Sequence, residues 1–143
     1  MDFFAVSASF AAGLVIGILI DKALSMSGKN SVIDKEKLLE ECFGEHMYVS
    51  RFSLVQARDW IKMRQDKIKD GTKAIVMKIT PETLKSLGKN IEIAQNMDNY
   101  LAIAVINGNT KEMQDSILVK YDNLDEKLEE LLDRGDGTLV VGV

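Results

Sequence analysis

The chain contains a long uncharged segment near its N-terminus, and this segment limits the folds and locations open to the protein. From Phe3 to Ile20 the sequence reads FFAVSASFAAGLVIGILI and carries no charge. As a helix, these 18 residues would be about 27 Å long, close to the roughly 30 Å hydrocarbon thickness of a membrane. The segment predicts a single-pass membrane-anchor helix within residues 1–22, in contact with lipid through residues 3–20.

Lysine residues predict the orientation of this helix. Lys22, Lys29, Lys35 and Lys37 follow the uncharged segment, whereas Asp2 is the only charged side chain before it. Positive residues near a membrane-spanning helix are enriched on the cytoplasmic side. We therefore expect a single-pass membrane protein whose C-terminal domain is cytoplasmic.

Two alternatives to a membrane span stay open. The stretch Ala23-Leu24-Ser25 resembles a signal-peptide cleavage site, although the segment lacks the basic region that precedes the apolar part of such peptides. A length of 18 residues also lies at the lower end of the spanning range. The second alternative is therefore a soluble oligomer, or a soluble ligand-binding domain, in which this helix is buried in a subunit interface.

Small residues recur within the segment at a spacing of four. They are Ala5, Ser9, Gly13 and Gly17, and the last two form a GxxxG motif. Residues four apart lie on one ridge of a helix, and small side chains there allow a second helix to approach closely. The pattern predicts helix association and a homo-oligomer, although Gly and Ala are also common in membrane helices for other reasons.

The remainder of the chain has the composition of one folded domain. Hydrophobic residues make up 46% of the sequence and charged residues 28%, with a single proline. Residues 23–30 are polar and glycine-containing, which is typical of a connector, and residues 31–143 are long enough to bury a core of their own. We therefore expect a chain truncated before Ser27 to fold as a soluble domain.

Periodicity and capping signals after residue 30 alternate between helix and strand. Asp34 is a predicted N-cap, Ser53 and Gln56 form a predicted capping box, and Thr80-Pro81-Glu82 is typical of a helix start. The patterns predict helices at 31–43, 54–69, from 80 to 88 and at 123–132, and strands at 46–52, 72–79, 90–96, 100–106, 116–121 and 138–141. Some connections are too short for parallel crossovers, so an α+β domain with a mixed β-sheet packed by helices is expected.

Charge indicates which partners suit this domain. The formal net charge is −4, which disfavours nucleic acid because phosphate binding needs a basic surface. Arg58, Lys62 and Lys69 belong to a basic group in the predicted helix 54–69, and they predict contact with an anionic membrane surface. The acidic helix 123–132 is either solvated surface or a docking site for a basic protein.

Cys42 and His46 are the only thiol and the only imidazole in the chain. A reactive cysteine needs a depressed pKa, but Glu40, Glu41 and Glu45 surround this one, so its pKa is expected at or above about 8.5. Two such side chains also fall short of the three or four ligands that zinc takes. We expect no cofactor and no metal, and a non-enzymatic, membrane-anchored interaction or scaffold module; a small Cys/His-dependent enzyme is the third hypothesis.

Overall fold

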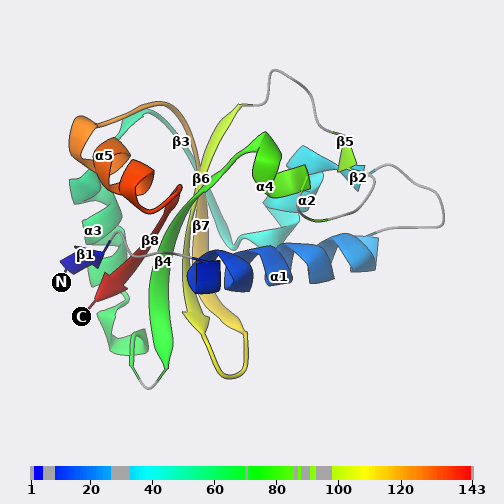
Figure 1. The fold of residues 1–143 in the computed structure, drawn as a ribbon, viewed down its shortest axis with the longest axis horizontal. Coiled ribbons are helices and arrows are strands. Elements are labelled where there is room, and N and C mark those ends of the chain that lie inside the picture. The colour runs from blue at the N-terminus through cyan, green and yellow to red at the C-terminus, as the bar shows by residue number, and fades with distance from the viewer. Residues whose placement is uncertain are drawn as a thin grey trace.

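A computed structural model describes residues 2–4, 9–26, 33–69, 71–85, 87, 91–92 and 98–142. Six strands form one sheet in the order β1-β8-β4-β6-β7-β3 (Figure 1). In that order their bounds are Asp2–Phe4, Thr138–Gly142, Thr72–Ile79, Asn99–Asn107, Met113–Leu124 and Glu45–Phe52. Only β3 and β7 pair in parallel, and the other pairs are antiparallel. The predicted α+β fold with a mixed sheet is confirmed.

Helices cover both faces of this sheet (Figure 1). One face packs against α1 (Ser9–Met26), α2 (Lys35–Cys42) and α4 (Pro81–Lys85). The other face packs against α3 (Leu54–Lys62) and α5 (Glu126–Arg134), and a short 3-10 helix, η1 (Gln65–Lys67), follows α3. Strands β2 (Ile33–Asp34) and β5 (Ile91–Glu92) form a separate parallel pair. Two apolar layers therefore enclose the sheet.

Strand β6 lies at the centre because it has no polar face to turn toward water. Every residue from Tyr100 to Ile106 is buried. Side chains alternate between the two faces of a strand, so Ala102 and Ala104 join the core beneath α1, and Leu101, Ile103 and Val105 join the core beneath α3 and α5. The apolar run YLAIAVI correctly predicted a central strand covered on both sides.

The N-terminal segment differs from its prediction. Phe3 and Phe4 belong to strand β1, where they pair with Val141 and Val140 of β8. The helix begins only at Ser9 and continues to Met26, so the predicted helix boundaries at residues 3–20 and 1–22, and the start of the connector at residue 23, are wrong. The helix extends past Asp21 and Lys22, and Ala23, on its next turn, is fully buried in the core that α1 shares with α2 and one face of the sheet.

The side of α1 that faces the sheet is part of the core. Leu19 and Ala23 have no exposed surface and Val15 is 2% exposed. Among the helices of the described residues, none is long and apolar enough to cross a membrane. The structure therefore gives no support to the predicted membrane span.

Most other local predictions are confirmed. Asp34 caps α2 by accepting a hydrogen bond from the Glu36 backbone N–H, and Ser53 and Gln56 form the predicted capping box of α3. Helix α3 ends at Lys62 rather than at residue 69, and strand β7 is longer than the predicted 116–121. Of the predicted strand 90–96, the structure shows Ile91–Glu92, and the other positions lie outside the described residues.

Candidate functional site

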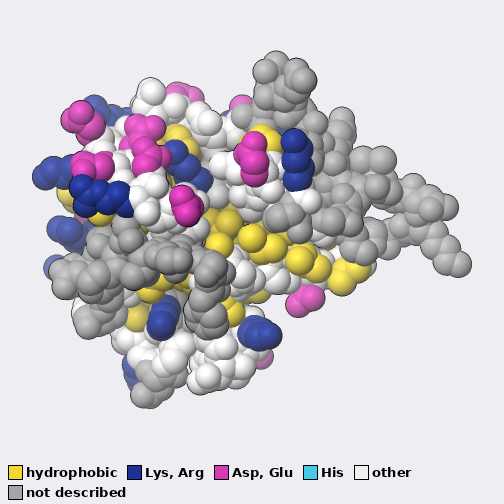
Figure 2. All heavy atoms as spheres, viewed as in Figure 1, with side chains coloured by type: hydrophobic (Ala, Val, Ile, Leu, Met, Phe, Trp, Pro, Cys, Tyr) yellow, Lys and Arg dark blue, Asp and Glu magenta, His cyan; other side chains and the backbone are white. Residues whose placement is uncertain are grey.

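The outer face of α1 is only partly covered by the described chain. We define this face by Gly13, Gly17, Ile20 and Leu24, which lie opposite the buried positions Val15, Leu19 and Ala23 on the helix. Leu24 is 49% exposed. The solvent side of a helix in a globular protein is normally polar, yet the first charged residue of α1 is Asp21. Figure 2 shows hydrophobic side chains gathered along this helix.

The packing of the described residues does not require glycine at positions 13 and 17. A Cβ atom added at either position would have nothing within 4 Å, and neither residue has a positive φ. A glycine inside a helix costs about 0.5–1 kcal/mol relative to alanine. The two residues therefore weaken α1 without a compensating contact from the described residues. Their missing side chains leave room for a second backbone.

A hollow lies along this face of α1. Its volume is about 490 Å³, and it is lined by Gly13, Leu14, Gly17, Ile18, Ile20, Asp21 and Lys111. Lys111 belongs to the turn between β6 and β7 and has φ 62°. Among the salt bridges of the described residues, none involves Asp21 or Lys111. The hollow therefore combines an apolar floor with one acidic and one basic side chain that form no ion pair there.

Two of the four residues predicted to mediate helix association belong to this face. Gly13 and Gly17 belong to it, and Ser9 is the first residue of α1. Ala5 lies outside the described residues. The association that these residues predict stays a prediction.

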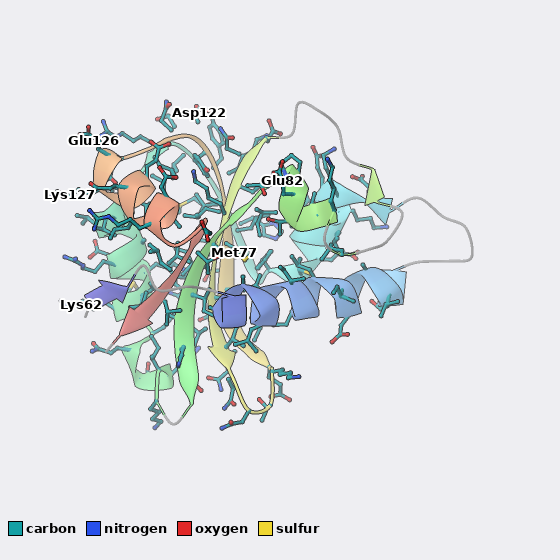
Figure 3. All side chains as sticks on the ribbon, viewed as in Figure 1. Lys62, Met77, Glu82, Asp122, Glu126 and Lys127 are labelled. Carbon is teal, nitrogen blue, oxygen red and sulfur yellow. The ribbon has the colours of Figure 1, made fainter. Side chains whose placement is uncertain are left out.

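The three basic residues predicted to contact an anionic membrane surface lie on the opposite side of the sheet from α1. Arg58 and Lys62 belong to α3, and Lys69 follows η1; all three are exposed. Figure 3 shows Lys62 on the α3 side of the protein, away from α1. Because α1 and α3 cover opposite faces of the sheet, one flat surface cannot contact the outer face of α1 and these three cations together.

Arg64, in the same basic group of the sequence, has a structural role instead. Its guanidinium binds Glu45 of β3 at 2.6 Å and Asp115 of β7 at 2.7 Å, and Nη1 donates to the Trp60 carbonyl at 2.9 Å. It also stacks on the Trp60 ring, 3.7 Å from the centroid. Lys67 adds a contact to Asp115 at 3.3 Å. These contacts tie the end of α3 to two strands.

We expect Arg64→Met to lower the free energy of unfolding at neutral pH by about 1–3 kcal/mol, because two carboxylates lose a charged donor. Burial raises the pKa of Asp115, but hydrogen bonds from Arg64 and Lys67 outweigh it and hold the pKa below its usual 3.8. The stabilisation is therefore present above that value and is lost as the pH falls. Urea unfolding at pH 7 and near pH 3 should show a smaller pH dependence in Arg64→Met. The exposed control Lys62→Met should match the native protein at both pH values, and equal behaviour of the two variants would contradict the assignment.

Cys42 and His46 lack the features of a catalytic pair. Burial raises the pKa of the Cys42 thiol to about 11, with Lys22 opposing the shift and Glu41 adding to it. The predicted direction is confirmed, although burial contributes more than the neighbouring glutamates. His46 Nε2 lies 3.0 Å from the Phe43 carbonyl oxygen. In the described ranges, no group of three or more His, Cys, Asp or Glu side chains is placed to hold a metal.

Sequence reasoning missed a second pocket, which lies between α2 and the sheet. It is lined by Glu36, Glu40, His46, Met47, Tyr48, Tyr100, Leu118 and Lys120. These residues come from α2, β3, β6 and β7, so no local pattern in the chain joins them. Strand register brings them together.

Comparison with known proteins adds no assignment for either surface. No protein family model, no curated protein and no solved structure matches this chain.

Proposed function

We propose that this protein is a non-enzymatic interaction module that associates with a second copy of itself through the outer face of α1. The observation that carries the proposal is the open space over Gly13 and Gly17, on a helix whose residues 9–20 are uncharged. In the proposed dimer, the two α1 helices cross at these glycines, where their backbones approach most closely. Contact removes apolar surface from water on both copies, which stabilises association by roughly 25 cal/mol for each Å² buried.

Charge complementarity favours a second copy over an unrelated apolar partner. Asp21 and Lys111 line the same hollow. In a two-fold symmetric dimer, any contact between a residue of one copy and a different residue of the other copy occurs twice. Asp21 of each copy would then face Lys111 of its partner across the axis. Two such pairs would set the register of the helices, although exposed ion pairs add only about 0–1 kcal/mol each.

Membrane association is a second candidate function for the same face. The absence of charge from Ser9 to Ile20 favours it, because a charged side chain facing lipid is unfavourable. In this arrangement α1 would lie along the membrane surface with its outer face in the lipid, since its other side is packed against the sheet. The predicted cytoplasmic location of the domain would hold for either arrangement.

Sedimentation equilibrium over a range of protein concentrations tests the self-association. Gly13→Ile with Gly17→Ile should weaken the dimer at least about tenfold, or about 1.4 kcal/mol, because the new side chains hold the helices apart. Gly13→Ala with Gly17→Ala should raise the stability of the fold by about 0.5–1 kcal/mol per site while weakening the dimer. Because the alanine variant is expected to fold more stably but to dimerise more weakly, the two measurements distinguish an effect on association from an effect on folding.

The control for this experiment uses exposed apolar residues on the other side of the sheet. Val55 and Met63 are 60% and 81% exposed, and alanine at both positions should leave the association constant unchanged. A native protein that sediments as a monomer throughout, without lipid, would contradict self-association. If that monomer also floats with phosphatidylcholine vesicles and the Gly13→Asp variant does not, the membrane candidate takes its place.

A further inference from the structure

The pocket beneath α2 has features of a recognition site that are independent of the proposed dimer. We call it the α2 pocket and define it by Glu36, Glu40, His46, Tyr48, Tyr100 and Lys120, with Leu118 as its apolar wall. Its volume is about 280 Å³. That is slightly below the roughly 300–1,000 Å³ of pockets that enclose a drug-sized molecule, so a single long side chain is a suitable occupant.

Strand register builds the floor of the α2 pocket. Tyr100 of β6 lies opposite Lys120 of β7, and Lys120 lies opposite Tyr48 of β3. Side chains of paired residues project on the same face of a sheet. A row of Tyr, Lys and Tyr therefore crosses three neighbouring strands, on the face that also carries α1 and α2.

The charges that are not neutralised within the pocket are negative. Lys120 Nζ is already paired with Asp98 at 3.1 Å. The Tyr48 hydroxyl donates to Asp122 at 2.7 Å, at the edge of the protein where Figure 3 labels Asp122. Glu36 and Glu40 lie one turn apart on α2, and neither takes part in a salt bridge between described residues. The pocket therefore favours a cation.

Tyr100 supplies a second, independent indication of a ligand. Its side chain is only 9% exposed, it lines the pocket, and no hydrogen bond joins its hydroxyl to another described residue. Burial, with the negative charges of Glu36, Asp98 and Glu40, raises the pKa of Tyr100 against the opposing effect of Lys120, so the hydroxyl stays protonated at neutral pH. Among the described residues, Trp60 Nε1 is the only fully buried side-chain polar atom without a partner, so the Tyr100 hydroxyl is open to the pocket and available to a ligand. Its oxygen can accept a hydrogen bond from a guanidinium or ammonium group, and its ring can attract that group's charge.

The neighbouring strand indicates how the cation would arrive. β3 is the last strand of the sheet, and in the described structure it pairs with β7 alone. Its eight residues present a much longer edge than β1, the three-residue strand at the other end of the sheet. An extended peptide can pair with such an edge and place alternate side chains on one face of the sheet. His46 and Tyr48 of this strand line the pocket.

We propose that the α2 pocket binds an arginine or lysine side chain of an extended peptide segment from a partner protein, with that segment paired along the edge of β3. Glu36 and Glu40 neutralise the cation, Tyr100 accepts one of its hydrogen bonds, and the ring of Tyr48 covers its stem. Acidic segments are excluded from the pocket by the two free carboxylates.

Fluorescence anisotropy with a labelled peptide of about nine alternating threonine and valine residues, with arginine at the centre, tests the ligand chemistry. Replacing arginine by citrulline keeps the shape and removes the charge, and it should weaken binding about tenfold or more. Raising the salt concentration should weaken the arginine peptide selectively, because salt screens charge pairs. Equal binding of the two peptides would overturn the proposal.

Backbone-modified and small-molecule probes test the edge pairing. N-methylation of the peptide at alternate residues removes the donors that a sheet edge needs, and methylation on the pairing side should abolish binding. Methylation of the other alternate set should leave the affinity unchanged, and if neither set weakens binding, pairing with β3 is contradicted. Agmatine, a free guanidinium compound, should compete at least about tenfold more weakly than the peptide, and equal competition would contradict the peptide as the source of the cation.

Protein variants assign the binding to the α2 pocket. Glu36→Gln with Glu40→Gln should weaken the arginine peptide about tenfold, while the matched α5 pair Glu126→Gln with Glu129→Gln should not change its affinity. Tyr100→Phe should weaken binding about threefold with an unchanged urea midpoint. Native affinity in the Glu36 and Glu40 variant would overturn the site, whatever the oligomeric state of the protein.

Discussion

A chain truncated before Ser27 is expected to lose cooperative folding, in contrast to the soluble domain that the sequence predicts. Truncation removes Leu14, Val15 and Leu19, which are each at least nine-tenths buried, and a fully buried side chain of this size stabilises the fold by about 1.5–3 kcal/mol. It also exposes the sheet residues that α1 covers. The summed loss is comparable with the roughly 5–15 kcal/mol total stability of a typical domain.

Urea titration followed by circular dichroism measures this effect. The truncated chain should show a broad, non-cooperative transition or aggregate. Deleting only residues 1–4 is the control: it removes β1 and leaves α1 in place, so a sigmoidal transition should persist. A sharp transition in the longer truncation, at the native midpoint, would show that α1 is an appendage and would restore the predicted boundary between an N-terminal helix and a separate domain.

Leu19→Asp should destabilise the protein by about 4 kcal/mol or more, whereas Leu24→Asp should change the free energy of unfolding by less than about 1 kcal/mol. Leu19 has no exposed surface and Leu24 is 49% exposed. A carboxylate introduced at Leu19 would be buried among apolar groups without a partner. At Leu24 the carboxylate would stay in water, and it should weaken the association of α1 rather than the fold.

The free energies of unfolding should be measured at a protein concentration well below the dissociation constant of the dimer, so that association does not contribute to them. The comparison also distinguishes a packed helix from a loosely attached one. If α1 did not pack on the sheet, both side chains would be exposed to water and aspartate would have a similarly small effect at the two positions. Similar losses at Leu19 and Leu24 would contradict the packing of α1 on the sheet.

The sequence by itself determined the elements whose signals are local. The Ser53–Gln56 capping box begins α3 because both partners lie within one turn, and the Asp34 cap begins α2 for the same reason. The apolar run from Tyr100 to Ile106 predicted a central strand, since only a strand covered on both faces can bury every side chain. Strand β4, at Thr72–Ile79, has its predicted bounds.

Only the tertiary structure decided how the N-terminal segment is used. An uncharged helix suits lipid, a subunit interface and the face of a sheet equally well by composition, and the choice depends on residues far along the chain. Val140 and Val141 pair with Phe4 and Phe3, which shortens the segment that remains for the helix. Its inner side then covers the apolar face of the sheet, where Ile75 and Met77 of β4 are buried.

The end of α3 and the α2 pocket were also decided by distant residues. Helical periodicity continues past Lys62, but Arg64 turns to bind Glu45 and Asp115, which come from two different strands. Tyr48, Tyr100 and Lys120 become neighbours because β3, β6 and β7 pair in one register. Caps and apolar periodicity arise within a few residues, and so the sequence determined them. The pairing that joins Lys120 to Tyr100 and to Tyr48 connects residues 20 and 72 positions apart, and the free energy that selects it is gained only when the whole sheet is assembled.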